Sequence, residues 1–364
     1  MAEVVFFTGF PGFLGTELLP RVLRRSPGAE AVCLVQPQFL DQARRRADEL
    51  AAADEQLAGR IRLVEGDITR PDLGLGGERD ELLASIREVF HLAAVYDLEV
   101  SRSLGLRVNV DGTRHVLDLC EQAPDLQRLH YVSTCYVSGR WPGIFREDDL
   151  VLGQRFSNHY EETKYLAEVL VRERAAAGQP VTTYRPAVVG GDSATGATQK
   201  YDGPYFLVRW MLKQPRVAFV PMVGDPEGYR FNIVPRDYVI DAIAALSARE
   251  DTVGGTYALA DPRPYTIAEM MELFSRVTRR RLVTFRLPLG LAQWALRRIP
   301  GLQRLMQIPP AAVAYLSHPT HYTTDAATPL LEEEGIHLPD RAAWFAAMAD
   351  FVRANPDVSS KAMV

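Results

Sequence analysis

The chain has 364 residues, 47% of them hydrophobic and 24% charged, and a net charge of −5. This length exceeds the roughly 100–200 residues of an average domain, so it predicts one large unit with a smaller one attached. The apolar and charged contents exclude a disordered or low-complexity chain. The acidic balance argues against binding to nucleic-acid phosphates.

The cysteines and the N-terminus indicate the cellular compartment. Cys33, Cys120 and Cys135 are widely spaced and form neither a disulfide nor a metal-binding pattern. Glu3 stands where a signal peptide would be basic, and glycines interrupt the apolar run behind it. No stretch reaches the roughly 18 apolar residues of a membrane span. We therefore expect a soluble cytoplasmic protein, and the seven histidines lack the spacing of metal ligands.

Short apolar runs alternate with amphipathic stretches through the first half of the chain. Runs this apolar predict parallel strands with helices on both faces of the sheet. The expected strands are Val4–Thr8, Ala31–Val35, Arg60–Val64, Val89–Leu92, Arg128–Val132 and Val181–Arg185. The expected helices are Phe13–Arg25, Asp41–Ala53, Glu78–Arg87, Leu104–Gln122 and Asn158–Ala177.

After about residue 190 the pattern changes to glycine- and proline-rich loops. Asp237 is expected to cap a helix that follows it, with a substrate contact as the alternative, and Thr256–Leu259 is expected to form one more strand. Thr266 and Glu269 have the spacing of a capping box, and the remaining C-terminal third is typical of helices.

These elements predict an α/β protein with a Rossmann-type, doubly wound parallel sheet. Residues 1–190 would form the dinucleotide-binding domain, and residues 191–364 a smaller, mainly helical substrate lobe. The strand at 256–259 is expected to return to the sheet of the first domain.

A glycine-rich loop, TGFPGFLG, directly follows the first strand. Glycine lets the backbone approach a pyrophosphate closely, and the next helix directs its N–H groups at that charge. Any tight turn from strand to helix favours glycine, so the position matters more than the motif. The loop predicts a cofactor cradle formed by Thr8, Gly9, Gly12, Phe13, Leu14 and Gly15.

The residue that ends the second strand bears on the cofactor's identity. An acidic residue there would bind the ribose hydroxyls of NAD, whereas arginine would favour NADP. The chain has Gln36, with no acid before Asp41, and Arg44, Arg45 and Arg46 follow on the next helix. The missing carboxylate favours NADP(H), with NAD(H) as the alternative.

Tyr160 and Lys164 lie four residues apart and therefore share one face of an expected helix. A cation one turn away would lower the pKa of the phenol from its usual value of about 10. A tyrosine packed on the sheet, with a lysine extending over it, is the structural alternative. Thr134 follows the strand at 128–132, where its hydroxyl could hold a substrate carbonyl while Tyr160 transfers a proton.

Taken in order, these motifs resemble the extended short-chain dehydrogenase/reductases. The matching segments are TGFPGFLG, Gly66-Asp67, HLAA (His91–Ala94), NVDGT (Asn109–Thr113), VSTCYVSG, YEETK and Tyr184-Arg185-Pro186. The resemblance implies that Tyr160 is the acid–base, Lys164 binds the nicotinamide ribose and Thr134 orients the reacting oxygen. It also implies cofactor contacts from Asp67, Ile68, Ala93, Ala94, Asn109, Pro186, Ala187 and Val188.

Two longer strings are similar to the fatty acyl-CoA and thioester reductase branch, also called male-sterility-type reductases. They are GDITRPDLGL ahead of HLAAVYDL, and VAYLSHPTHYTTDAATPLLEEEGI near the C-terminus. This branch implies reduction of an acyl thioester, presented as acyl-CoA or on an acyl-carrier partner, or reduction of an aldehyde or ketone. Gln36 departs from the arginine usual there. The resemblance also implies a homodimer formed through Leu104–Gln122 and Asn158–Ala177.

Other functions stay open at this point. A sugar-nucleotide epimerase or dehydratase, or a hydroxysteroid-type dehydrogenase, would use the same residues, whereas a non-catalytic NADP-binding regulator would not need Tyr160. Cys135 is expected to be a packed core residue and not a nucleophile. The stretch 288–310 is expected to be a lobe helix with one buried face, although its arginines and Trp294 would also suit a membrane surface or a cover for an acyl chain.

Overall fold

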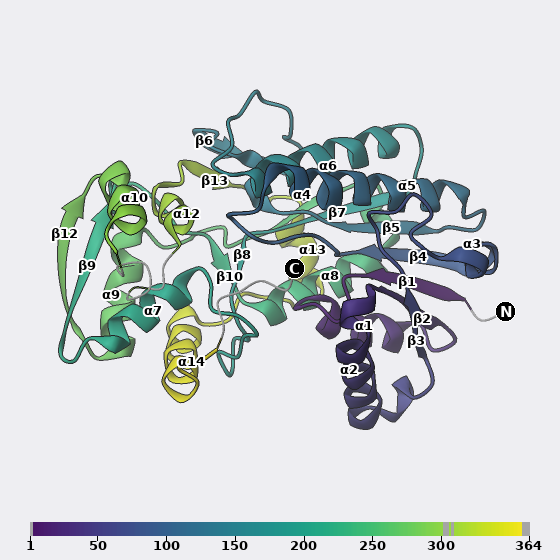
Figure 1. Ribbon diagram of the computed structural model, residues 1–364, viewed down its shortest axis with the longest axis horizontal. Helices are drawn as coiled ribbons and strands as arrows, with labels where there is room; N and C mark the ends of the chain where they lie inside the picture. Colours follow the sequence, from purple (N-terminus) through teal and green to yellow (C-terminus); the bar gives the residue numbers. More distant parts are fainter. Residues whose placement is uncertain (1–2, 301–305, 307–308, 359–364) are drawn as a thin grey trace.

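A seven-stranded parallel sheet forms the centre of the computed structural model, which describes residues 3–300, 306 and 309–358 (Figure 1). The strand order is β11-β7-β5-β4-β1-β2-β3, so the direction of winding reverses between β1 and β4. This order confirms the predicted Rossmann-type fold, in which ligands bind beyond the carboxyl ends of the strands near such a reversal. The strands are β1 (Val4–Thr8), β2 (Glu30–Val35), β3 (Ile61–Glu65), β4 (Ile86–His91), β5 (Arg128–Val132), β7 (Val181–Pro186) and β11 (Thr256–Leu259).

Two hydrophobic layers bury the two faces of this sheet. Strand β1 is buried throughout and alternates between them, because Val5 and Phe7 join one layer and Val4 and Phe6 the other. The first layer is covered by α1 (Gly15–Arg25), α2 (Leu40–Ala53), α8 (Arg236–Ala248) and α13 (Ala327–Glu333). The second is covered by α3 (Arg79–Ser85), α5 (Gly112–Gln122) and α6 (His159–Ala176).

The lobe lies at the left of Figure 1, away from the sheet, around a separate apolar core. It contains a two-stranded parallel ribbon, whose strand β12 lies at the far end of the molecule. Its elements are α7 (Pro204–Lys213), β9 (Val217–Val223), α9 (Ile267–Thr278), β12 (Arg281–Leu287), α10 (Leu289–Arg298), α12 (Pro310–Val313) and α14 (Arg341–Ala354). Two further strand pairs are short. Strand β8 (Val188–Val189) pairs with β10 (Ile233–Val234), and β6 (Gly143–Phe145) pairs with β13 (Thr320–Tyr322).

Several segments beyond residue 190 pack on the sheet and not in the lobe. Strand β11 pairs with β7 at the edge of the sheet, where the strand at 256–259 was expected. Helices α8 and α13 cover one face together with α1. The division at residue 190 itself stays a prediction.

Some expected elements are wrong in detail. The helix expected to end at Arg87 ends at Ser85, because β4 already begins at Ile86. Strand β12 lies in a region expected to be helical; its alternation of arginine, β-branched and aromatic residues suits a ribbon. The helix expected at 104–122 begins as α4 (Arg102–Gly105) and passes through a π-helical segment, Leu106–Asp111, before α5.

Asp237 was expected to cap α8 but does not. The helix begins at Arg236, and Pro235 is the residue that precedes it. The Asp237 carboxylate instead accepts a hydrogen bond from the Ser193 backbone N–H at 2.8 Å and another from the Ser193 hydroxyl. Asp237 therefore fixes the loop that leaves the sheet for the lobe. The capping box of Thr266 and Glu269 is present at the start of α9.

Helix α10 has the expected single buried face, because Ala292 and Leu296 are buried whereas Leu291 and Trp294 are exposed. Residues 301–305 and 307–308 of the same stretch lie outside the described residues. Within the ranges that the structure describes, no helix is long and apolar enough to cross a membrane. Helices α5 and α6 pack together, and the homodimer expected through them stays a prediction.

Candidate active site

Three glycines of the loop between β1 and α1 lie where the surrounding backbone leaves no room for a side chain. Gly9 has a φ of +95°, and a Cβ there would lie 2.8 Å from the backbone nitrogen of Ala93. A Cβ on Gly12 or Gly15 would lie 2.6 or 2.5 Å from the carbonyl oxygen of Gly9. All three positions thus require glycine, and the tight turn directs the N-terminus of α1 toward the space above the sheet. This cradle fits the pyrophosphate of a dinucleotide, which needs close backbone approach at a helix N-terminus.

A buried polar chain supports this cradle from below. The Thr113 hydroxyl donates to the Asn109 carbonyl at 2.6 Å, so it accepts from the Nε2–H of His91 at 3.0 Å. His91 Nδ1 then accepts from the Thr8 hydroxyl at 2.7 Å, and Thr8 Oγ1 accepts from the Ala93 N–H at 3.3 Å. Burial lowers the pKa of His91 to about 3, so its ring is neutral and acts as a fixed link.

Asn109 was predicted to bind the cofactor, and the structure puts it elsewhere. It is buried behind the cavity wall and does not line the cavity. Its Oδ1 accepts from the Val95 N–H at 2.9 Å, and its Nδ2 donates to Thr163 Oγ1 at 3.1 Å. Asn109 therefore positions the segment after β4 against α6, and both of its polar groups are used within the protein.

The opposite end of the cradle meets the carboxyl ends of β2 and β3. Gln36 lines the cavity and accepts a hydrogen bond from Gln38 at 3.1 Å, so two amides stand where a NAD-type site would have an acid. Asp67 also lines the cavity, and its Oδ1 accepts from the Thr69 N–H at 2.8 Å. Gln38 is a lining residue that the sequence did not single out.

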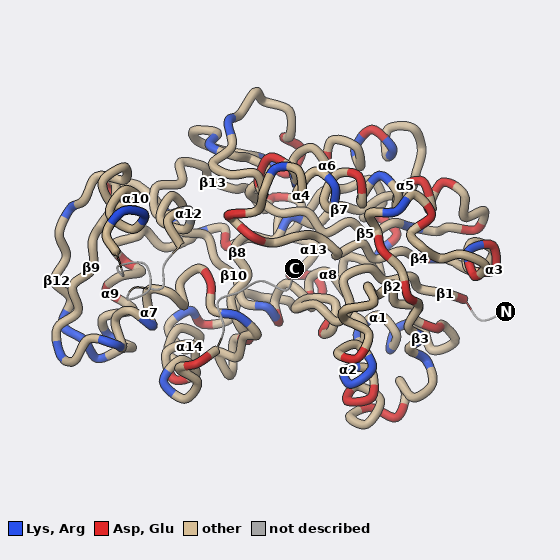
Figure 2. The backbone as a smooth tube through the Cα atoms, viewed as in Figure 1, with Lys and Arg blue, Asp and Glu red and all other residues tan. Residues whose placement is uncertain are grey.

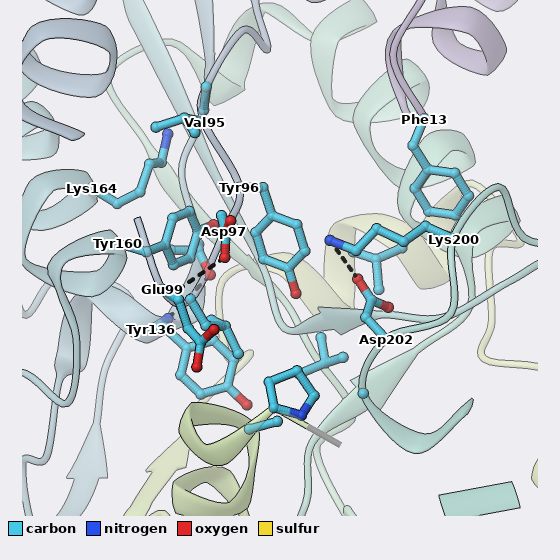
Figure 3. Close-up of a pocket in the computed structure, with 18 of the residues that line it drawn as sticks. Phe13, Val95, Tyr96, Asp97, Glu99, Tyr136, Tyr160, Lys164, Lys200 and Asp202 are labelled. Atoms are coloured by element: carbon cyan, nitrogen blue, oxygen red, sulfur yellow. Dashed lines mark hydrogen bonds and ion pairs between the residues drawn. The ribbon is translucent and has the colours of Figure 1, made fainter. Parts of the chain in front are cut away.

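The three predicted catalytic residues line the same cavity. Thr134 lies two residues beyond the end of β5, and Tyr160 and Lys164 lie one turn apart on α6; all three are buried. Lys164 Nζ donates to the Tyr131 hydroxyl at 3.0 Å and to the Val132 carbonyl at 2.9 Å. Figure 3 shows Tyr160 and Lys164 at the left of the view, with the Tyr96 ring to their right.

The pKa of Tyr160 differs from the expectation. Burial raises it above the usual value, which outweighs a lowering by the nearby Thr134 hydroxyl. Burial also lowers the pKa of Lys164 to about 7. The predicted lowering of the phenol pKa by Lys164 is therefore wrong for this structure, because the ammonium group is buried and bound to Tyr131 and Val132.

A buried ion pair holds the strand ends that carry these residues. Arg185 on β7 binds Glu168 of α6 through Nη2 at 2.5 Å and through Nε at 3.0 Å. The same carboxylate accepts from the Ser133 hydroxyl at 2.5 Å. Because Ser133 precedes Thr134 and Arg185 precedes Pro186, one carboxylate fixes both cavity-lining positions.

The cavity has a volume of about 1380 Å³ and extends from the cradle into the lobe. Every predicted cofactor-binding or catalytic residue except Asn109 lines it. Beyond Tyr160 its wall becomes apolar and includes Phe206, Leu207, Trp210, Val223, Ala292 and Leu296. We call this inner part, between α7, β9 and α10, the apolar gallery.

Several polar lining residues had no signal in the sequence. Tyr96 packs edge-on against Tyr160, with ring centroids 5.1 Å apart. Lys200 Nζ lies 4.5 Å from the centre of the Tyr96 ring and 3.5 Å from an oxygen of Asp202 (Figure 3). Lys200 and Asp202 lie in an irregular loop, and only the fold brings that loop over the catalytic residues. Tyr136 and Tyr315 also line this region and pack edge to face.

Cys135 is confirmed as a packed core residue. It is 1% exposed, its thiol donates to the Arg185 carbonyl at 3.0 Å, and it does not line the cavity. Burial raises the pKa of the thiol, which disfavours the thiolate that a nucleophile requires. Among the described residues, no group of three His, Cys, Asp or Glu side chains could hold a metal ion.

Fold and site together define an NAD(P)-dependent oxidoreductase of the extended short-chain dehydrogenase/reductase type. The model of the family described as "Male sterility protein" matches residues 7–243, and the chain belongs to this family. The fold is similar to the crystal structure of the terminal R domain from the myxalamid PKS-NRPS biosynthetic pathway, with a TM-score of 0.82 and 27% identity over 99% of this chain and 93% of that one.

Curated relatives are much longer proteins. The chain is 29% identical over 286 residues to "Glycine betaine reductase ATRR" of Emericella nidulans, which covers 74% of this chain and 22% of that protein. It is 30% identical over 275 residues to "Aldehyde reductase lnaA" of Aspergillus flavus, which covers 71% of this chain and 26% of that protein. The chain thus spans about a quarter of the length of these relatives. A UDP-glucuronic acid 4-epimerase from Bacillus cereus shares the fold, with a TM-score of 0.66 at 17% identity.

Proposed function

We propose that this protein reduces an acyl thioester, presented on a carrier arm or as acyl-CoA, or the corresponding aldehyde or a ketone. One observation carries the proposal: a single cavity joins the glycine cradle, the Tyr160 hydroxyl and the apolar gallery. A hydride donor at the cradle and an apolar acyl group in the gallery would then meet beside Tyr160. The names of the relatives, among them an aldehyde reductase and a terminal R domain, agree with this reaction class.

The bound nicotinamide would supply the hydride. Tyr160 is the proton donor: burial raises its pKa, so the phenol is protonated at neutral pH and can donate to an oxygen that gains charge. The Thr134 hydroxyl orients that oxygen from the end of β5. Lys164 is held by Val132 beside the same cavity, where an ammonium group can donate hydrogen bonds to ribose hydroxyls of the cofactor.

The gallery favours an apolar substrate over a nucleotide sugar. Phe206, Leu207, Val223, Ala292 and Leu296 offer no hydrogen bonds to hydroxyl or phosphate groups. Burying those polar groups against such walls would leave them unpaired, at a cost of roughly 2 kcal/mol or more for each group. The sugar-nucleotide alternative therefore gains no support from the lining of this cavity.

For the cofactor we propose NADP(H) over NAD(H). Gln36 and Gln38 replace the carboxylate that would bind the ribose hydroxyls of NAD and repel a 2′-phosphate. Their amide groups can donate hydrogen bonds to phosphate oxygens.

The decisive experiment measures oxidation of NADPH and NADH with acyl-pantetheine thioesters, acyl-CoA thioesters, aldehydes, ketones and UDP-sugars, with product analysis by mass spectrometry. We expect thioesters to yield aldehydes or alcohols and NADPH to be preferred. Conversion of the UDP-sugars alone would overturn the proposal, and so would cofactor binding without turnover of any substrate in the panel.

A further inference from the structure

Two segments of the lobe are strongly basic in this acidic protein. Residues 204–224 and 273–300 together contain ten Lys and Arg and no Asp or Glu, although the whole chain has a net charge of −5. These two segments form α7, β9, the end of α9, β12 and α10, which lie side by side at the left end of Figure 2. A charge asymmetry of this kind steers an oppositely charged partner toward one surface.

Parallel pairing brings six of these cations together. Strands β9 and β12 start at the same level, because Arg281 is paired with Val217 and its N–H donates to the Arg216 carbonyl at 3.0 Å. Helices α7 and α9 end just before those two strands. We call the resulting cluster the basic corner; it consists of Lys213, Arg216, Arg276, Arg279, Arg280 and Arg281.

Within the described part of the chain, none of the five arginines of the basic corner forms a salt bridge with a carboxylate, whereas Arg249 alone binds three. Arg276 lies in the last turn of α9, where a cation stabilises the helix dipole, and Arg280 donates to the Gln214 carbonyl at 2.6 Å. Arg216 and Arg281 are exposed and have neither of these structural roles.

Apolar side chains are exposed on the same ribbon. Phe219 is 54% exposed, Phe285 is 48% exposed, and Val283, which is paired with Phe219, is 38% exposed. On α10, the next element, Trp294 is 55% exposed. Aromatic residues with arginine, in the absence of acids, are the composition of a protein-binding surface. Exposed large apolar residues that gather in one place also point to a binding role.

This surface and the substrate cavity share the same elements. Val220 and Val223 of β9, Leu287 of β12, and Ala292 and Leu296 of α10 line the cavity, and the exposed residues lie on the same three elements. A partner bound to the ribbon would therefore contact elements that also form the wall of the apolar gallery.

We propose that the β9–β12 ribbon, with its basic corner, is the docking surface for an acidic carrier domain that presents the acyl thioester. This inference rests on the proposed function, because only a carrier combines a thioester arm, a phosphate at the base of that arm and a folded acidic surface. The arginines pair with the acidic surface and the phosphate, and Phe219 and Phe285 pack on the apolar residues of the carrier. A lipid surface would offer negative charge but no thioester, and a second copy of this chain would bring the same positive charge.

The test compares one acyl group on two supports. An octanoyl group is attached to an acidic acyl carrier protein in one series and to free pantetheine in the other, and kcat and KM are measured for the wild-type protein and for the Arg216→Glu/Arg281→Glu variant. We expect kcat/KM for the carrier-bound thioester to fall by about tenfold or more through KM, and this loss to shrink at high salt. With octanoyl-pantetheine, kcat/KM stays within about twofold of the wild-type value.

The matched control is Arg155→Glu/Arg263→Glu, which makes the same change of charge at two exposed arginines outside the lobe surface. Its kinetics with both supports are expected to equal those of the wild type. Equal losses in the two double variants would overturn the docking surface, and so would an Arg216/Arg281 variant with wild-type KM for the carrier. Loss of binding to phosphatidylglycerol vesicles, or loss of a dimer, with unchanged carrier kinetics would also overturn it. If the wild-type protein reduces neither support, thioester reduction fails as the proposed function and the docking surface fails with it; if it reduces both and the variant does not distinguish them, only the docking surface fails.

Discussion

The walls of the cavity change in character between the glycine cradle and the apolar gallery. At the cradle, a Cβ on Gly9 would lie 2.8 Å from a backbone nitrogen, and His91 below it joins two hydroxyl groups in a fixed tautomer. In the gallery, Phe206, Val223 and Leu296 pack as apolar groups without any directed bond. Backbone contacts and hydrogen bonds tolerate no substitution, whereas apolar packing tolerates changes that keep the volume. Variants at the cradle and the catalytic residues should therefore affect every substrate, and gallery variants should affect substrate choice.

The largest effect is expected at Tyr160. Tyr160→Phe removes the hydroxyl and keeps the ring that packs against Tyr96, so kcat should fall roughly a thousandfold with every substrate, the scale of general acid catalysis. NADPH binding, measured by fluorescence titration, should persist. Tyr165→Phe on the same helix is the control, because Tyr165 packs against Phe156 and does not line the cavity. Turnover within a few-fold of wild type in Tyr160→Phe would remove Tyr160 from its proposed role.

Gly9→Ala should weaken cofactor binding by about a hundredfold, because the backbone must shift where the pyrophosphate binds. The dissociation constant for NADPH measures this effect. Gly59→Ala is the control: Gly59 also has a positive φ, of +72°, but nothing lies within 4 Å of its Cβ position. It should lower the free energy of unfolding by about 1 kcal/mol and leave cofactor affinity unchanged. If both variants bind NADPH as the wild type does, the cradle is not the pyrophosphate site.

Lys164 should make stability depend on pH. Burial lowers its pKa to about 7, from the value of 10.5 that the unfolded chain has. Between these values the unfolded chain binds one proton more, so the free energy of unfolding gains up to about 1.4 kcal/mol per pH unit as pH rises. Below pH 7 Lys164 is protonated in both states, so the full cost of burying its charge lowers the free energy of unfolding. Urea denaturation should show Lys164→Met more stable than wild type near pH 6, with an advantage that shrinks above pH 7; parallel curves would contradict the shift.

Gln36→Asp tests the cofactor end of the cavity. A carboxylate at this position repels a 2′-phosphate and can accept from ribose hydroxyls, so the ratio of kcat/KM for NADPH to that for NADH should fall about tenfold or more. Gln36→Asn keeps the amide and serves as the control. An unchanged ratio in Gln36→Asp would show that Gln36 does not lie beside the 2′ position.

The sequence predicted the cradle side of the cavity far better than the lobe side. The glycine loop and the Tyr160–Lys164 pair are local patterns whose spacing carries their geometry, and the structure brings them to one cavity. Lys200 lies in a loop without periodicity, so nothing local indicates that it reaches Tyr96. Asn109 matched a motif, but whether its amide faces the cofactor or the protein depends on Val95 and Thr163, which only the fold brings together.

The lobe escaped prediction because its contacts join distant segments. The β9–β12 pairing connects residues more than sixty positions apart, and the gallery forms between α10 and α7, which lies in the region that was expected to be loop-rich. Tertiary packing of this kind overrides local propensity. The same reason explains why the arginines of the basic corner are scattered in the sequence and adjacent in the fold.

The smallest effect is expected in the gallery, where it should depend on the substrate. Ala292 is 5% exposed and lines the cavity, so Ala292→Trp fills part of the gallery. We expect kcat/KM for dodecanoyl-pantetheine to fall several-fold, about 1 kcal/mol of lost binding, while butyryl-pantetheine and NADPH affinity are unaffected. Leu291→Trp, one residue away and 48% exposed, adds similar bulk on the outer face of α10 and should leave both thioesters unchanged. An equal loss for both chain lengths in Ala292→Trp would mean that the gallery supports the fold and does not hold the acyl chain.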